Sequence, residues 1–169
     1  MNNKALVIFA SSAPNGNTAQ LLKSVDNLIE LEHIDLKDYK ITAFDYEHKN
    51  KDDDFLPIIK KILAYDKIIF ACPVYWYTMP AQMKVFFDRI SDVLAIEKDL
   101  GRQLRGKTAY ILSTGYSEKP ERSFEEVFLN SFKYLGINYG KMLYSACPNG
   151  FVEANSLAKI QDFANEIIA

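Results

Sequence analysis

Continuous apolar runs alternate along this chain with segments whose apolar residues recur every three or four positions. Runs such as 5–10 and 67–71 show no polar alternation, which is typical of strands buried on both faces of a parallel sheet. Further strands are predicted at 34–36, 108–112 and 142–147. The recurring segments predict helices that turn one apolar face toward the sheet, the second of them over about 55–65. This order of strand and helix predicts a single α/β domain over residues 1–169, with a five-stranded parallel sheet and helices on both faces.

Local signals mark where two of the helices begin and where one ends. Asn17 followed by Gln20, and Ser123 followed by Glu126, have the spacing of a capping box. Gly136 comes after the last apolar residue of the fourth helix, as a left-handed C-terminal glycine does. We therefore expect side-chain caps at both helix starts and a stop at Gly136.

Charged segments and isolated reactive side chains predict little chemistry by themselves. Residues 37–54 are irregular and charge-rich, and 49–54 and 97–106 are interpreted as solvated or polar connections. His33 and His48 lie among charged residues without companion ligands, which predicts surface positions. Cys72 and Cys147 have no metal-ligand spacing, which favours small buried thiols, and no metal site is expected.

Composition narrows the class of partner. A hydrophobic content of 49% and a charged content of 25% are ordinary for a globular domain. A net charge of −2 offers no broad basic surface, so nucleic acid and acidic membranes are not expected partners. No apolar run approaches transmembrane length, and the start of the chain lacks the layout of a signal peptide, which predicts a cytoplasmic protein.

Three loops that follow predicted strands carry the unusual side chains. The loop 11–18 offers small hydroxyl and amide groups at the positive end of a helix dipole, which suits a phosphate, although capping and turn formation explain it equally well. It is neither a Walker loop nor a three-glycine dinucleotide fingerprint. The segment 73–80 places three aromatic residues between two prolines, where they either cover the core or face a ligand. The loop 113–120 combines glycine, hydroxyls and an aromatic ring.

Two motifs resemble the flavodoxin-like NAD(P)H-dependent FMN reductase and quinone reductase family. The first is the loop 11–18, which ends in Gly16-Asn17-Thr18 like the phosphate loop of the family. The second is Pro73-Val74-Tyr75-Trp76, which leads into Pro80-Ala81-Gln82-Met83-Lys84 and then Phe87-Asp88-Arg89. The resemblance spans nearly the whole chain and is weakest in its last third. It implies a flavodoxin-like three-layer sandwich with strand order 2-1-3-4-5, in which FMN lies at the switch point between strands one and three.

The resemblance also implies FMN as cofactor, NADPH or NADH as electron donor, a small-molecule acceptor and a homodimer. The cofactor-binding residues that it implies are Ser11, Gly16, Asn17, Thr18 and Ala19, then Pro73, Val74, Tyr75 and Trp76, and finally Thr114, Gly115, Tyr116 and Ser117. Among these, Tyr75, Trp76 and Tyr116 are candidate walls of a substrate slot, or else pack against the flavin alone. Many members carry an arginine in the phosphate loop where this chain has Ala13, so the phosphate must rely on neutral donors, the helix end or a charge from elsewhere.

Three kinds of function fit these residues. A reductase would pass hydride from a nicotinamide to the flavin, and a quinone, free flavin, nitro or azo compound or ferric complex would then take the electrons. The cofactor carries that chemistry, so no catalytic acid or base is expected. A flavodoxin-type electron carrier usually has a strongly acidic surface, which a net charge of −2 does not match. A flavin-free binding domain on the same scaffold is disfavoured by the loop chemistry.

Overall fold

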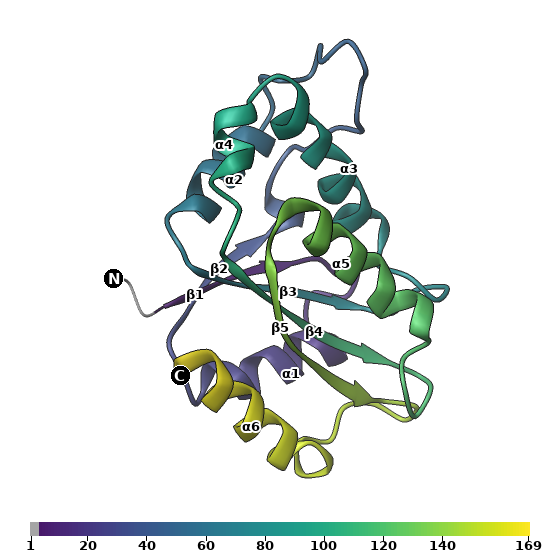
Figure 1. Ribbon diagram of the computed structural model, residues 1–169. Coiled ribbons are helices and arrows are strands. Elements are labelled where there is room, and N and C mark those ends of the chain that lie inside the picture. Colours follow the sequence, from purple (N-terminus) through teal and green to yellow (C-terminus); the bar gives the residue numbers. More distant parts are fainter. Residues whose placement is uncertain (1–3) are drawn as a thin grey trace.

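Five parallel strands form the middle layer of the computed structural model, which describes residues 4–169 (Figure 1). They are β1 (Ala5–Phe9), β2 (Leu31–Asp35), β3 (Lys67–Pro73), β4 (Thr108–Gly115) and β5 (Asn138–Ala146). Their order in the sheet is β2-β1-β3-β4-β5, and every neighbouring pair is parallel. The predicted fold class and strand order are therefore confirmed.

Helices cover both faces of this sheet, as predicted (Figure 1). One face carries α1 (Asn17–Asp26) and α6 (Leu157–Ile168), and the other carries α2 (Phe55–Leu63), α3 (Ala81–Ala95), α4 (Lys98–Arg102) and α5 (Arg122–Leu135). Two short 3₁₀ turns, η1 (Leu36–Asp38) and η2 (Glu153–Asn155), complete the regular structure. None of the helices in residues 4–169 has the length and apolar character needed to cross a membrane.

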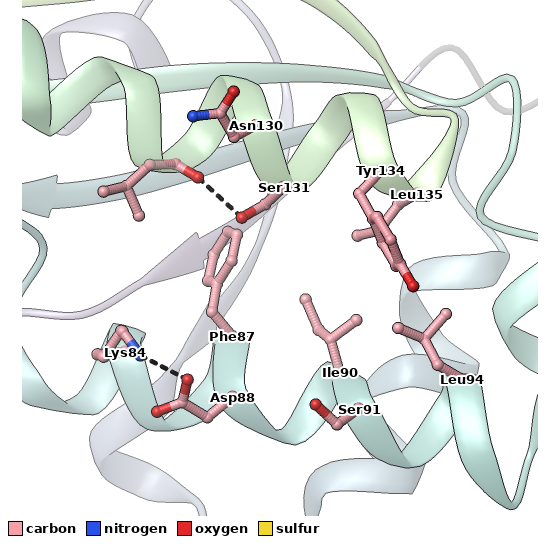
Figure 2. A pocket seen from close by; sticks show the side chains of 11 residues that line it. Lys84, Phe87, Asp88, Ile90, Ser91, Leu94, Asn130, Ser131, Tyr134 and Leu135 are labelled. Carbon is pink, nitrogen blue, oxygen red and sulfur yellow. Dashed lines mark hydrogen bonds and ion pairs between the residues drawn. The ribbon is translucent and has the colours of Figure 1, made fainter.

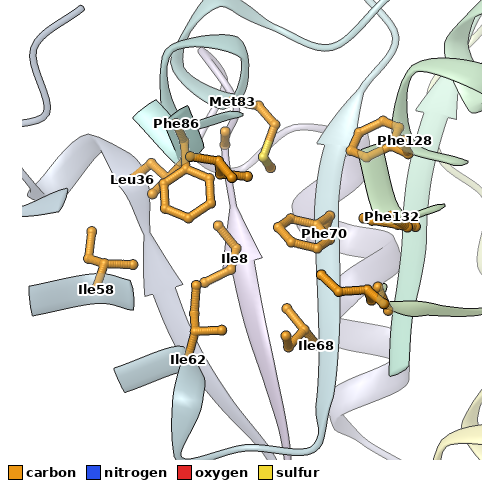
Figure 3. Packing of buried hydrophobic residues seen from close by; sticks show 14 of the residues in the cluster. Ile8, Leu36, Ile58, Ile62, Ile68, Phe70, Met83, Phe86, Phe128 and Phe132 are labelled. Atoms are coloured by element: carbon orange, nitrogen blue, oxygen red, sulfur yellow. The ribbon is translucent and has the colours of Figure 1, made fainter. Parts of the chain in front are cut away.

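The alternation of side chains along each strand divides the core into two clusters. In β1, Leu6 and Ile8 point to the α2–α5 side while Val7 points to the α1–α6 side, and all three are fully buried. Figure 3 shows the larger cluster, in which Phe70 of β3 lies close to Phe132 of α5, with ring centroids 5.5 Å apart. The uniformly apolar runs were therefore strands buried on both faces, as the pattern predicted.

Several elements extend beyond the apolar runs that predicted them. β4 continues through Ser113 to Gly115, because its polar end still pairs with β3 and β5 and the Ser113 hydroxyl donates to the Cys72 carbonyl at 2.7 Å. β5 likewise begins earlier than predicted, at Asn138, whereas α2 ends at Leu63, short of the predicted end near residue 65. The connection 97–106 is not simply polar, because it forms α4 and buries Leu104.

The capping box predicted for α5 is wrong, whereas the predicted helix stop is confirmed. α5 begins at Arg122, with Glu121 as N-cap and no side-chain cap. The Ser123 hydroxyl instead donates to the Tyr77 carbonyl at 3.3 Å, which ties α5 to the loop after β3. Gly136 ends the helix with a φ of 71°, in the left-handed region that glycine adopts without strain.

The charged segment 49–54 is not a freely solvated connection, because Arg89 of α3 is fully buried against it. The Arg89 guanidinium binds Asp53 at 2.5 Å and Asp92 at 2.8 Å. The guanidinium also lies 4.9 Å from the ring centroid of Phe55. His48 was predicted at the surface, but its side chain is only 18% exposed and its Nδ1 lies 2.8 Å from Asp92. We call these four residues, Asp53, Arg89, Asp92 and His48, the ionic cluster.

Asp53 holds its charge despite being almost buried. Burial by itself would raise the pKa of its carboxyl group, but hydrogen bonds from Arg89, from Thr42 and from the Phe55 N–H outweigh that penalty. The pKa of Asp53 is therefore lowered from its usual value. The ionic cluster fixes the long connection 40–54 onto α3.

Candidate functional site

The carboxyl ends of β1, β3 and β4 lie at one edge of the sheet. Register places Phe9 beside Ala71 and Pro73 beside Thr114, so the three strands end nearly level. The loops that follow them are the same three loops that the sequence singled out. In a sheet of this strand order, the crevice outside these strand ends is where ligands bind.

The loop after β1 is a tight turn held by its own polar groups. The Ser11 hydroxyl accepts from the Ala13 N–H at 3.1 Å and lies 3.2 Å from the Ala13 carbonyl, to which it can donate. The Gly16 N–H donates to the same carbonyl at 3.0 Å. A Cβ at Gly16 would lie 2.8 Å from the Ala13 Cβ, so this close approach requires glycine.

The start of α1 presents backbone donors rather than a side-chain cap. Gly16 is the N-cap and no side chain caps the helix, so the N–H groups of Asn17, Thr18 and Ala19 have no acceptor within the helix. The predicted capping box is wrong, because the side-chain Oδ1 of Asn17 accepts from the Phe151 N–H at 3.0 Å and the Gln20 side chain donates to the Asn15 carbonyl. Three free N–H groups at the positive end of a helix fit a phosphate.

The start of α1 and the end of β4 meet through two hydroxyl groups. Thr18 of α1 and Thr114 of β4 place their Oγ1 atoms 2.7 Å apart, and both side chains are buried. The Thr114 carbonyl also accepts from the Val74 N–H at 2.9 Å. Thr114 therefore contacts both of the other loops.

The aromatic segment after β3 forms a tight turn with unusual backbone geometry. Tyr75 and Thr78 exchange N–H···O bonds of 2.9 and 3.1 Å across it. Trp76 and Tyr77 occupy the two central positions with φ of 47° and 67°, which is the geometry of a type I′ turn. Side chains other than glycine and asparagine pay roughly 1–2 kcal/mol each for this conformation. The turn leaves the Trp76 side chain 90% exposed.

A hollow of about 290 Å³ lies between this turn and the loop after β4. Of the residues implied by the resemblance, it brings together Val74, Trp76, Gly115, Tyr116 and Ser117. Its other lining residues are Tyr77, Lys119 and Pro120, which lie in the loops that the sequence singled out, and Glu121 and Tyr144, which sequence reasoning missed. Two exposed aromatic rings, Trp76 and Tyr116, therefore line a space of the size that a planar ring system needs.

Tyr144 supports the far side of the hollow. Its hydroxyl donates to the Ser117 carbonyl at 2.7 Å, and burial raises the pKa of that hydroxyl, so the phenol stays protonated as a donor. A Cβ at Gly115 would lie 2.6 Å from the same oxygen, which explains why glycine ends β4. Sequence reasoning missed Tyr144 because the apolar pattern around it predicted only a buried strand. The signal that could have identified it as a site residue was a tyrosine near the end of a strand that lies beside the other loops.

The remaining implied residues lie outside this hollow. Ser11, Gly16, Asn17, Thr18, Pro73, Tyr75 and Thr114 are absent from its lining. The side chain of Ala19 lines a different hollow, together with Phe9 and His33. The implied residues thus lie in two groups, one at the start of α1 and one around Trp76 and Tyr116, and the contact between Thr18 and Thr114 joins α1 to β4.

The cysteines are buried thiols, as predicted. Cys72 is fully buried, and burial raises the pKa of its thiol well above its usual range. Burial also raises the pKa of the Cys147 thiol. Within residues 4–169, His, Cys, Asp and Glu side chains form no group of three that could hold a metal ion.

Solved structures place this architecture in a known class. The NAD(P)H:quinone oxidoreductase from Methanothermobacter marburgensis superposes with a TM-score of 0.73 at 15% identity, over 98% of this chain and 94% of that one. The FMN-dependent NADH-azoreductase from Bacillus anthracis, solved with FMN, gives 0.70 at 12% identity, over 98% of this chain and 100% of that one. Megasphaera elsdenii flavodoxin gives 0.60 at 12% identity, over 97% and 98% of the two chains. The protein therefore has a flavodoxin-like fold.

Sequence comparison adds the family. The family model for NADPH-dependent FMN reductase matches residues 3–150, so the chain belongs to that family. YwqN of Bacillus subtilis, which carries the description of an NAD(P)H-dependent FMN-containing oxidoreductase, is 30% identical over 146 residues, 80% of this chain and 81% of its own length. The chain is therefore an enzyme of the NAD(P)H-dependent FMN oxidoreductases, with FMN as its cofactor. The residues present fit that cofactor, because neutral N–H and hydroxyl donors converge at α1 and aromatic walls line the hollow beyond it.

Proposed function

We propose that this enzyme takes hydride from NADPH or NADH and passes the electrons to a small oxidised acceptor. The acceptor classes that suit it are a quinone, a free flavin, a nitro or azo compound, or a ferric complex. The observation that carries the proposal is the hollow between the strained turn and the loop after β4, where Trp76 and Tyr116 are 90% and 80% exposed. Exposed aromatic walls beside a flavin site give a planar nicotinamide or acceptor a surface on which to stack.

Each end of the site has a separate task. The N–H groups of Asn17, Thr18 and Ala19 hold the phosphate, together with the Ser11, Asn17 and Thr18 side chains. The segment from Pro73 to Trp76 and the segment from Thr114 to Ser117 line the ring system from two sides. Bound FMN supplies the redox chemistry, so the protein contributes binding, orientation and exclusion of water.

A single substrate slot would fix the order in which the nicotinamide and the acceptor bind. Trp76 and Tyr116 line a single hollow of about 290 Å³, so a nicotinamide and an acceptor ring would stack on the same exposed walls beside the flavin. The oxidised nicotinamide must therefore leave before the acceptor enters. We infer a ping-pong mechanism, in which plots of reciprocal rate against reciprocal substrate concentration are parallel.

The test is a stopped-flow trace of the flavin absorbance without oxygen. Mixing the holoenzyme with NADPH or NADH should abolish the oxidised flavin band no more slowly than steady-state turnover, and a quinone added afterwards should restore it. An electron carrier of the flavodoxin type would keep its oxidised spectrum in both nicotinamides. That result would refute the reductase proposal.

A pair of variants tests the aromatic walls. Tyr116→Trp adds bulk to a wall of the hollow, and it should slow reduction by the nicotinamide more than it weakens FMN binding. Tyr46→Trp is the matched control, because Tyr46 is 89% exposed and does not line the hollow. Equal reduction rates in the two variants would remove Tyr116 from the slot.

A second groove supports the proposal that the enzyme is a homodimer. A groove of about 500 Å³ lies between α3 and α5, and Figure 2 shows Phe87, Ile90 and Leu94 of α3 facing Tyr134 of α5 across it. Leu94 is 40% exposed and Tyr134 is 76% exposed. We propose a second copy of this chain as the occupant, since the groove also carries Lys84 and Asp88, which pair with each other along α3 and whose opposite charges can instead pair across a two-fold axis.

Light scattering tests the dimer. The wild-type protein should have the mass of two chains, and Leu94→Glu should have the mass of one. Leu28→Glu is the control, because Leu28 is 45% exposed but lies outside the groove. A monomeric wild type would refute the dimer.

We also propose a cytoplasmic location. Two free and buried thiols, Cys72 and Cys147, are typical of a reducing compartment. Fractionation of cells followed by immunodetection tests it, and recovery of the protein outside the cytoplasmic fraction would contradict it.

A further inference from the structure

The hydroxyl groups of Thr18 and Thr114 form a buried contact between segments that are 96 residues apart in the sequence. Their Oγ1 atoms are 2.7 Å apart, and the residues are 2% and 3% exposed. Each hydroxyl carries one proton, so one of the two donates to the other and the second proton is left over. Within residues 4–169, neither hydroxyl has another hydrogen-bond partner, so the second proton awaits an acceptor.

The direction of this hydrogen bond decides what Thr18 offers to a ligand. If Thr18 donates to Thr114, the lone pairs of the Thr18 oxygen face the start of α1, and an anion there is repelled. If Thr114 donates to Thr18, the Thr18 proton is free to be donated in turn. Chains of hydroxyl groups that donate in one direction also strengthen one another.

We propose that Thr114 is a positioning residue for the FMN phosphate and acts through Thr18. Its hydroxyl donates to Thr18 Oγ1, which directs the Thr18 proton at the phosphate bound by the N–H groups at the start of α1. This assignment rests on the proposed phosphate site, in which the backbone of Thr114 borders the ring system while its side-chain hydroxyl is assigned to Thr18.

The location of Thr114 suits it to this task. It lies near the end of β4, an interior strand, and its own carbonyl is fixed by the Val74 N–H at 2.9 Å. The Thr18 side chain is therefore held in one orientation before the ligand arrives, and less conformational freedom is lost on binding. The same threonine links the phosphate end of the site to the loop that carries Trp76.

The test compares FMN with riboflavin, which lacks the phosphate. Dissociation constants of both are measured on apoprotein by quenching of flavin fluorescence. Thr114→Val keeps the shape of the side chain but removes the hydroxyl, and it should weaken FMN about tenfold while riboflavin changes less than about twofold. Thr114→Ser restores a hydroxyl and should bind FMN within about twofold of wild type. Thermal melting of each apoprotein reports whether it is folded, and Thr114→Ala replaces the valine variant if that variant does not fold.

A double variant shows whether Thr114 acts through Thr18. In a Thr18→Val background, Thr114→Val should cause no further loss of FMN affinity, because the hydroxyl that it orients is gone. Equal losses of FMN and riboflavin, or additive losses in the double variant, would show that Thr114 contacts the ring or acts independently and would overturn the inference. Unchanged FMN affinity in Thr114→Val would overturn it as well.

The wild-type protein separates this inference from the proposed function. If the wild type binds riboflavin as tightly as FMN, there is no phosphate contact for Thr114 to prepare, and the inference fails while a flavin reductase still stands. If the wild type binds neither flavin, the proposed function fails too. If the wild type prefers FMN, the phosphate contact is supported, and the variants then test whether Thr114 acts through Thr18.

Discussion

Replacing Arg89 with methionine should destabilise the protein strongly without touching the flavin site. Arg89 is fully buried and pairs with two carboxylates, so Arg89→Met leaves the Asp53 and Asp92 charges without their cation. Removing one partner of a buried ion pair typically costs about 3–5 kcal/mol. In the variant Asp53 keeps its hydrogen bonds from Thr42, and Asp92 keeps its contact with His48. We therefore expect the free energy of unfolding to fall by the lower end of that range, about 3 kcal/mol.

Urea unfolding measures this loss. With a slope of about 2 kcal/mol per molar urea, a loss near 3 kcal/mol lowers the midpoint by about 1.5 M. Arg102→Met is the matched control, since Arg102 pairs with Asp99 at the surface and exposed pairs contribute little. Asp53→Asn in the Arg89→Met background should recover part of the loss, because it removes one of the uncompensated charges. A midpoint for Arg89→Met within about 0.5 M of wild type would show that the ionic cluster does not stabilise the fold.

Three further predictions follow from the site and the ionic cluster. Trp76 is the only tryptophan and lies at the ring end of the site, so FMN should strongly quench its emission, and unchanged emission at saturation would place the flavin elsewhere. Tyr77→Gly removes the side chain that makes the positive φ unfavourable, and it loses little burial because Tyr77 is 60% exposed. It should therefore raise the free energy of unfolding by about 1 kcal/mol. A lower melting temperature would contradict the strain. The pKa of Asp53 is lowered in the folded protein, so its contribution is complete above its unfolded pKa of about 3.9 and is lost as pH falls through the folded value. Asp53→Asn should therefore flatten the loss of stability below about pH 4 in urea melts, and an unchanged acid limb would contradict the shift.

The fold was predictable because its signals are local. Runs such as 68–71 are apolar at every position, which is the pattern of a strand buried on both faces. The site edge followed from the same reasoning, because parallel strands bring their carboxyl ends together. The loop 11–18 and the aromatic segment 73–80 were therefore placed correctly at one edge of the sheet.

The predictions failed where a residue far away in the sequence determines the local structure. Asn17 looks like a cap, but the Phe151 N–H, 134 residues away, occupies its oxygen. The segment 49–54 looks solvated because the cation that buries Asp53 lies on α3, 36 residues further on. Tyr144 enters the hollow only because β5 lies beside β4. Pairwise contacts across such separations leave no periodic signal in one sequence.

The two-sided core has a consequence for how this chain folds during synthesis. β1 is made first, and its Val7 belongs to a cluster that also contains Ile160, Phe163 and Ile167 of α6, which follows every strand in the sequence. Until α6 has left the ribosome, the part of this sheet face that α6 covers has no helix over it. The α1–α6 half of the core is therefore completed only at the end of synthesis, and its apolar surface is exposed to other chains until then.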